Sequence, residues 1–199
     1  MSQMTTDQRP PEYLRADAAR NLQRIVEVAA RMLGDDPHVG MAAVAAAADV
    51  SRATVYRHFP TREALVDAIR TQALAAGAQA LTDCRLEEGT ATEALERLVA
   101  AWLEVAERYG FAQLVGHPGT GLGGIDRQAR RAEFGKPLFA LIARGQAAGE
   151  FAAAITPEWG ARVFGAVVIA AARAVDEGAL SRTDAAATVF HTLTKGFTA

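Results

Sequence analysis

The sequence predicts an all-α protein, with a small helical domain at its N-terminus and a longer helical bundle after it. Alanine, the strongest helix former and a weak core filler, accounts for 45 of the 199 residues. Apolar residues recur at helical spacing along most of the chain. Helix-start and helix-stop residues separate these periodic segments. Together these features favour long, closely packed helices and exclude an all-β sandwich or barrel.

The N-terminal third contains four predicted helices. Residues 1–14 are expected to form a flexible leader. A first helix from Leu14 has one apolar stripe and stops at Gly34–Pro37. The stripe consists of Leu22, Ile25, Val26, Ala29 and Leu33. The next three helices are expected over Met41–Ala48, from the N-cap Ser51 to Phe59–Pro60, and from Thr61 towards Leu81.

The rest of the chain predicts longer helices. They are expected over Thr92–Tyr109, Ile125–Gly149 with a kink at Pro137, Pro157–Glu177 and Ser181–Lys195. The glycine-rich segment Gly116–Gly124 has no preceding strand, so it is interpreted as a connector and not as a nucleotide-binding loop. The change in helix length places a domain boundary along the fourth helix, which divides residues 15–62 from residues 63–199.

Composition excludes several classes of protein. The single cysteine, Cys84, forms no internal disulfide, and the four histidines lack the spacing of a zinc site. The start of the chain does not resemble a secretory signal, and the longest apolar run is about half a membrane span. We therefore expect a cytoplasmic protein without a cofactor, a metal or catalytic residues. The net charge of −2 carries no strong signal for nucleic acid.

Residues 44–59 have the pattern of a helix-turn-helix. The small Ala45 allows two helices to approach, and a tight turn follows at Asp49. Val50 fills the gap between the helices, while Val55 and Phe59 place the inner face of the second helix on the core. The outer face then carries hydrogen-bond donors that can reach phosphate oxygens or the acceptor edge of guanine.

The stretch AAADVSRATVYRHFPTREAL, residues 46–65, resembles the signature of the TetR (tetracycline-repressor-like) family of bacterial transcriptional regulators. The resemblance covers roughly residues 15–70, and the remainder matches the family in helix number and length. This sequence departs from the family pattern at three positions. Asp49 stands where the family usually has Gly, Gly40 where it has a Ser or Thr cap, and Arg62 where it has Lys.

The resemblance implies that the helix after the turn is a recognition helix, which enters the major groove of DNA. Its candidate DNA-binding residues are Ser51, Arg52, Ala53, Thr54, Tyr56, Arg57 and His58, with Arg62 at the start of the next helix. We assign Arg52 and Arg57 to base reading. Thr54, Tyr56, His58 and Arg62 are assigned to phosphate contacts. Arg15 and Arg20 can add sequence-independent attraction.

The C-terminal aromatic residues are open to two interpretations. Trp102, Phe111, Phe134, Phe139, Trp159 and Phe164 fit an ordinary core. The family resemblance implies instead a pocket for a small apolar or aromatic ligand. We expect its lining to comprise Trp102, Phe111, Phe134, Leu138 and Phe164. A void beside the kink at Pro137 would contribute to it.

The segment Pro157–Glu177 is apolar almost all round, which predicts burial on two sides. With the last helix it fits a homodimer interface as well as it fits an interior helix. The candidate interface residues are Gly165, Ala166, Ile169 and Ala170.

The function hypothesis is therefore a homodimeric repressor that binds a palindromic operator and is released by a small ligand, with the fourth helix carrying the signal. The alternative is a helical ligand-binding or scaffold dimer whose DNA-binding motif has decayed at Gly40 and Asp49. A helical-bundle enzyme is a third class, but the sequence lacks paired carboxylates, metal ligands and a nucleophile–base spacing.

Overall fold

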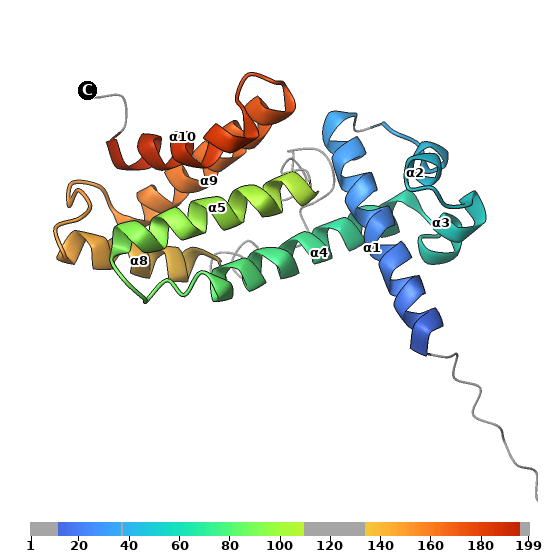
Figure 1. Cartoon of the computed structure of the whole chain (residues 1–199), viewed down its shortest axis with the longest axis horizontal. Helices are drawn as coiled ribbons and strands as arrows, with labels where there is room; N and C mark the ends of the chain where they lie inside the picture. The colour runs from blue at the N-terminus through green and yellow to red at the C-terminus, as the bar shows by residue number, and fades with distance from the viewer. Residues whose placement is uncertain (1–11, 37, 110–133, 196–199) are drawn as a thin grey trace, which may run out of the picture.

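The computed structural model describes residues 12–36, 38–109 and 134–195, and within these ranges the regular elements are all helices (Figure 1). The all-α prediction is confirmed. The N-terminal helices are α1 (Glu12–Asp35), α2 (Met41–Ala47), α3 (Arg52–His58) and α4 (Arg62–Asp83). The remaining helices are α5 (Ala91–Tyr109), α8 (Lys136–Ala147), α9 (Pro157–Asp176) and α10 (Arg182–Lys195). None of the described helices is long and apolar enough to cross a lipid bilayer.

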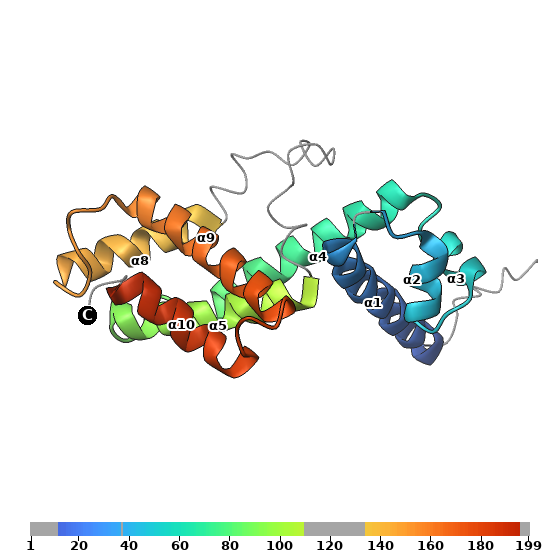
Figure 2. The same ribbon diagram turned by 90° about the horizontal axis from the view of Figure 1, so that it is seen from above.

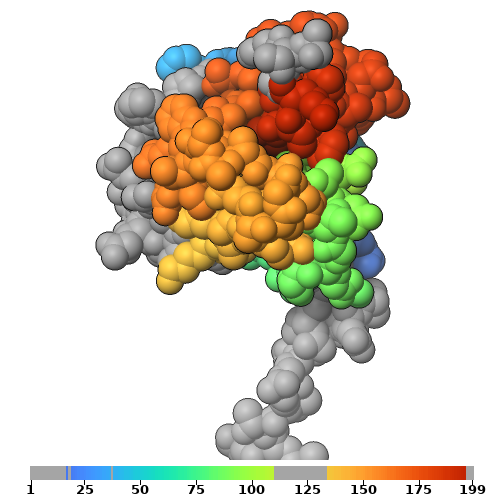
Figure 3. Space-filling view, turned by 90° about the vertical axis from the view of Figure 1, so that its left-hand side faces the viewer, coloured from blue at the N-terminus to red at the C-terminus, as the bar shows by residue number. Residues whose placement is uncertain are grey.

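The long helix α4 joins two helical units (Figures 1 and 2). The N-terminal unit consists of α1, α2, α3 and the first half of α4, with α3 at the end of the molecule. The C-terminal unit consists of the second half of α4 with α5, α8, α9 and α10. Figure 3 shows the opposite end of the molecule, where α8, α9 and α10 form most of the surface and α5 lies at its edge. The recognition helix and the bundle are therefore well separated.

Local capping explains most helix starts. The side-chain oxygens of Ser51, Thr61 and Thr156 accept hydrogen bonds from the backbone N–H groups three residues later, at the starts of α3, α4 and α9. Ser181 caps α10 in the same way, through the N–H of Asp184. Ser51, Thr61 and Ser181 are the predicted helix starts, and Thr156 directly precedes the predicted start at Pro157. Gly40, which precedes α2, makes no side-chain cap, as its lack of a side chain requires.

Pro137 lies in the first turn of α8, where its missing N–H costs no helical hydrogen bond. Residues 125–133 of the predicted helix lie outside the described residues, so the kink at Pro137 stays a prediction. One expectation for the C-terminal half was wrong. Trp159 is 58% exposed and does not belong to the core. Its position near the start of α9 points it away from the bundle, a direction that helical spacing alone does not fix. Phe111, Gly116–Gly124 and the first part of the predicted helix Ile125–Gly149 lie outside the described residues.

The buried side chains form two clusters. The first contains residues of α1 to α4, including Ile25, Val44 and Val55, and also Val105 and Tyr109 from the end of α5. The second fills the bundle between α5, α8, α9 and α10, with Leu98, Leu141 and Val168 among its members. No charged or polar residue is fully buried among the described residues. The helices are thus held mainly by apolar packing.

Three charged side chains fix the turns at the end of the bundle. Arg97 donates hydrogen bonds to the carbonyl oxygens of Cys84, Arg85 and Glu88. Arg144 donates to those of Leu86 and Gly89. Glu150, from the turn after α8, accepts hydrogen bonds from the backbone N–H groups of Ala91 and Thr92 at 3.1 and 2.8 Å. These side chains satisfy the unpaired backbone groups at the end of α4 and the start of α5.

The Glu150 contact makes stability depend on pH. The backbone N–H groups of Thr92 and Ala91 hold the pKa of Glu150 below its usual value. A carboxylate with a lowered folded-state pKa stabilises the fold above its unfolded pKa, and this contribution is lost as the pH falls through the folded pKa.

We expect Glu150→Gln to lower the melting temperature at pH 7. The difference in melting temperature between this variant and the wild type should disappear as the pH of the measurement is lowered into the acid range. Glu87→Gln, an exposed change of equal charge in the neighbouring turn, is the control. A pH-independent difference would contradict this role.

Candidate nucleic-acid interface

The turn between α2 and α3 has the geometry that the sequence predicts. Asp49 has a positive φ of 55°. The N–H of Asp49 bonds to the carbonyl of Ala46 at 3.2 Å, and the N–H of Val50 bonds to that of Ala45 at 3.0 Å. This pair of bonds is a Schellman ending, in which the left-handed residue is usually Gly. Ala45 is buried and Val50 is half-buried against the same core, so α3 is held firmly against α2.

The left-handed Asp49 provides a stability test. Asp49→Gly removes the Cβ contact that disfavours this conformation, and we expect a gain of up to about 1 kcal/mol, or about 2–4 °C in melting temperature. The change also removes a 3.8 Å ion pair with Arg24, but both side chains are more than half exposed, so that loss is small. Ala47→Gly in the preceding helix is the control and should destabilise by about 1 kcal/mol. A lower melting temperature for Asp49→Gly would mean that the Arg24 contact outweighs the strain.

The two faces of α3 differ sharply. Val55 is fully buried, and Phe59, directly after the helix, is 5% exposed. On the other face Arg52, Ala53 and Arg57 are exposed, and Tyr56 is 49% exposed. Two exposed arginines beside an exposed tyrosine hydroxyl provide donors that suit contacts with a phosphate backbone.

The remaining predicted residues surround this exposed face. Ser51 precedes α3, and its hydroxyl lies 2.8 Å from that of Thr54. Thr54 and His58 are half-buried on the flanks of α3, and Arg62 is half-buried at the start of α4. Seven of the eight predicted residues therefore lie on α3 or directly before it, and Arg62 begins α4 after a short turn. Arg20, at the far end of α1, is paired with Asp17. The Arg15 side chain lies outside the described residues.

Three of the predicted ligand-lining residues come together in the bundle. The Trp102 ring stands edge-on to Phe134 and to Phe164, with ring centroids 5.7 and 5.9 Å away. Leu138 belongs to the same buried cluster as Phe164. The Trp102 Nε1 is buried and has no hydrogen-bond partner among the described residues. An unpartnered buried donor of this kind costs about 1–3 kcal/mol unless something accepts from it. Sequence patterns identify the tryptophan but not this vacant hydrogen bond.

Helix α9 presents an open face. Phe164, Val168 and Ala171 are buried against the bundle. On the opposite side Ala166 and Ala170 are exposed, and a Cβ added at Gly165 would meet nothing within 4 Å. Ile169 is half-buried and packs against the bundle core from the flank of the helix. Within a single chain α9 is therefore buried on one side and not on the two sides expected.

A small helix-turn-helix unit carried on a larger helical bundle is the arrangement of a DNA-binding regulator. Residues 25–69 match the family model of bacterial regulatory proteins, tetR family. The resemblance stated from the sequence is thus confirmed, and the match falls within the N-terminal unit. No curated protein matches the chain.

Solved structures with the same fold include several TetR-like regulators. LfrR from Mycobacterium smegmatis, solved in complex with proflavine, is 24% identical with a TM-score of 0.67, and the match covers 90% of this chain and 98% of LfrR. MbdR from Azoarcus sp. CIB is 16% identical with a TM-score of 0.72, covering 90% and 100%. AibR, solved with isovaleryl coenzyme A and operator DNA, is 21% identical with a TM-score of 0.63, covering 89% and 100%. The likeness extends over the whole fold, including the bundle.

Proposed function

We propose that this protein is a cytoplasmic transcriptional repressor, which binds a palindromic operator as a homodimer and is released by a small apolar or aromatic ligand. The observation that carries the proposal is the exposed face of α3, where Arg52, Tyr56 and Arg57 project from a helix whose opposite side is buried. It acts as a regulator and not as an enzyme.

On DNA, α3 lies in the major groove with its first turn towards the bases. Arg52 and Arg57 read guanine edges, because a guanidinium can donate to both acceptors of guanine. Thr54, Tyr56, His58 and Arg62 contact phosphates and hold the register of the helix. Ser51 and Ala53 lie at the start of α3, where small side chains let the backbone approach the groove.

The homodimer forms through the open face of α9 together with α10. Gly165, Ala166, Ile169 and Ala170 supply small and apolar contacts, which allow two helices to pack closely. Two chains related by a twofold axis then present two recognition helices to inverted half-sites.

The ligand binds beside Trp102, Phe134, Leu138 and Phe164; the fifth predicted lining residue, Phe111, lies outside the described residues. Aromatic side chains in edge-on contact suit a ligand with a planar aromatic ring system. The unpartnered Trp102 Nε1 can donate a hydrogen bond to an acceptor atom on that ligand. Similar folds support the binding of a ligand, since LfrR was solved with proflavine and AibR with isovaleryl coenzyme A.

Release follows from a shift between two arrangements of the dimer. A Cβ at Gly77 of α4 would lie 3.0 Å from the Phe134 ring, so the aromatic cluster packs directly on the helix that carries Arg62 at its other end. A ligand that binds more tightly when α4 is tilted favours the DNA-incompetent arrangement.

Tryptophan fluorescence tests the ligand site. In Trp159→Phe the emission comes from Trp102 alone, since the chain has two tryptophans. We expect a planar aromatic compound, with proflavine as the first of a panel, to quench this emission, raise the melting temperature and weaken operator binding over one concentration range. In Trp102→Phe, which keeps the exposed Trp159, the quenching should be lost. Stabilisation without weaker operator binding would contradict the coupling between ligand and DNA.

A salt-dependent gel shift separates the repressor from the alternative, a ligand-binding or scaffold dimer with a decayed motif. With a duplex taken from the region beside its own gene, the logarithm of the binding constant should fall linearly with the logarithm of the salt concentration, with a slope of about −0.9 per phosphate contacted. Absence of a shift even at low salt would favour the alternative.

A further inference from the structure

The N-terminal unit is completed by two side chains from the bundle. Val105 and Tyr109, at the end of α5, are 8% and 3% exposed and belong to the first buried cluster, with Ile25, Val26 and Ala29. They lie about 80 residues further along the chain than these partners in α1. The DNA-binding domain is therefore attached to the bundle twice, once through the continuous helix α4 and once through this contact.

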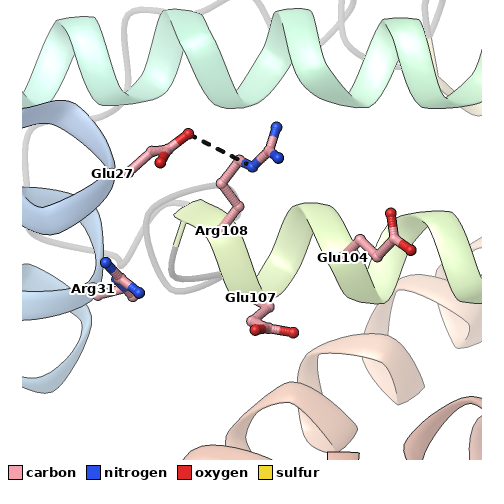
Figure 4. Close-up of a pocket in the computed structure, with 5 residues that line it drawn as sticks. All are labelled: Glu27, Arg31, Glu104, Glu107 and Arg108. Carbon is pink, nitrogen blue, oxygen red and sulfur yellow. Dashed lines mark ion pairs between the residues drawn. The ribbon is translucent and has the colours of Figure 1, made fainter. Parts of the chain in front are cut away.

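Polar contacts surround the buried pair. Gln23 of α1 donates to the Tyr109 hydroxyl at 3.3 Å and to the Glu27 carboxylate at 2.7 Å. The Arg108 guanidinium lies 3.6 Å from the Glu27 carboxylate (Figure 4). We call this set of five residues, Gln23, Glu27, Val105, Arg108 and Tyr109, the α1–α5 joint.

One side of the joint is open and charged. A cavity of about 310 Å³ between α1 and α5 is lined by Glu27, Arg31, Glu104, Glu107 and Arg108 (Figure 4). Further along, Arg182 pairs with Glu107. Burial, followed by the nearby carboxylates of Asp35 and Glu107, raises the pKa of Asp176 at the end of α9. Carboxylates from α1, α5 and α9 and the guanidinium groups of Arg31, Arg108 and Arg182 thus lie near one another on this side of the joint.

The joint is close to the aromatic cluster along one helix. Trp102 precedes Val105 by about one turn of α5 and Tyr109 by about two turns. The distance from Trp102 to Tyr109 along the helix axis is therefore roughly 10 Å. A helix is stiff over this length. A displacement of the Trp102 ring that moves α5 therefore also moves Val105 and Tyr109 within the core of the DNA-binding domain.

We propose that the α1–α5 joint positions the DNA-binding domain on the bundle and passes a displacement of Trp102 to α3. A single helical connection leaves the domain free to swing and to turn about α4, whereas a second attachment fixes its angle. In a dimer, this angle sets the separation of the two recognition helices and therefore the preferred spacing of the half-sites. This inference rests on the proposed function and adds a second route to the one through α4.

A charge exchange across the joint tests the proposal. Arg108→Glu and Glu27→Arg each bring like charges together, and the double variant restores an opposite pair. Glu104→Arg makes the same charge change in the cavity wall at a residue that has no ion-pair partner among the described residues. Melting temperatures and circular dichroism check that each variant folds. Binding is measured on a set of palindromic duplexes whose half-site spacing changes by one base pair at a time.

The wild type should prefer one spacing. We expect each single exchange to reduce that preference, measured as the affinity ratio between the best and the next spacing, by about threefold to tenfold. The double variant should recover it, and Glu104→Arg should keep it. A merely structural role would lower affinity for all spacings equally.

The outcomes separate this inference from the proposed function. Unchanged spacing preference in both single variants, or no recovery in the double variant, would overturn the positioning role while leaving the operator binding in place. Failure of the wild type to bind any symmetric duplex would overturn the proposed function, and the inference with it.

Discussion

Ala170→Glu should convert the protein into a monomer that binds its operator about 10²–10⁴-fold more weakly. The size of the loss follows from multivalency, because a dimer holds its second recognition helix at a high effective concentration beside the second half-site. Ala170 is exposed on the open face of α9, one turn from Ala166. Burying two glutamates across a twofold axis at this point costs far more than the small contact area returns.

Light scattering measures the loss of the dimer, and operator titration measures the loss of affinity for DNA. Ala143→Glu, at an exposed position on α8, is the matched control and should remain a dimer with full affinity. A stable wild-type monomer in light scattering would contradict the assignment of α9. So would an Ala170→Glu dimer with normal affinity.

Arg52→Ala is expected to give the largest change in sequence specificity. Loss of a bidentate contact to a base costs roughly 1–3 kcal/mol and should flatten the preference at one base pair in each half-site. Tyr56→Phe removes a phosphate contact and should weaken all sequences about equally. Both side chains are exposed on α3, so neither change disturbs the core.

The control for both variants is Lys136→Ala, which changes the charge of an exposed residue at the start of α8. Affinities are compared for duplexes with one substituted base pair at a time. An Arg52→Ala variant that keeps full discrimination would show that another residue, with Arg57 the next candidate, reads the base.

The parts of the fold that follow from local rules were predictable from the sequence. The caps Ser51 and Thr61 and the left-handed turn at Asp49 depend on residues within a few positions of one another. The inward direction of Val55 and Phe59 depends on helical spacing in the same way. Because Val55 and Phe59 fix the buried side of α3, they also fix the side on which the candidate DNA-binding residues are exposed, so that side was predictable before the tertiary structure was known.

Features that depend on distant packing were not predictable. Helical spacing places Val105 and Tyr109 on an inner face of α5, but it does not show that this face enters the core of the DNA-binding domain. The same limit explains Trp159, whose ring faces away from the bundle. The vacant hydrogen bond of Trp102 is likewise a property of its surroundings and not of its neighbours in sequence.

The two attachments of the DNA-binding domain bear on how a ligand would act. Phe134 contacts α4 at Gly77, and Trp102 lies on α5 near Tyr109, so one aromatic cluster touches both helices that hold the domain. A ligand that separates these rings would displace both attachments together.

Selection from a random pool of duplexes tests the central claim most directly. The purified wild-type protein is incubated with the pool at near-physiological salt, and the bound sequences are enriched and read. The proposed dimer predicts that the enriched sequences share a twofold-symmetric motif, with half-sites centred about one helical turn or slightly more apart. In the same selection with Arg52→Ala, the motif should lose its base preference at one position in each half-site. Enrichment of no motif, or of a single unpaired half-site, would contradict it.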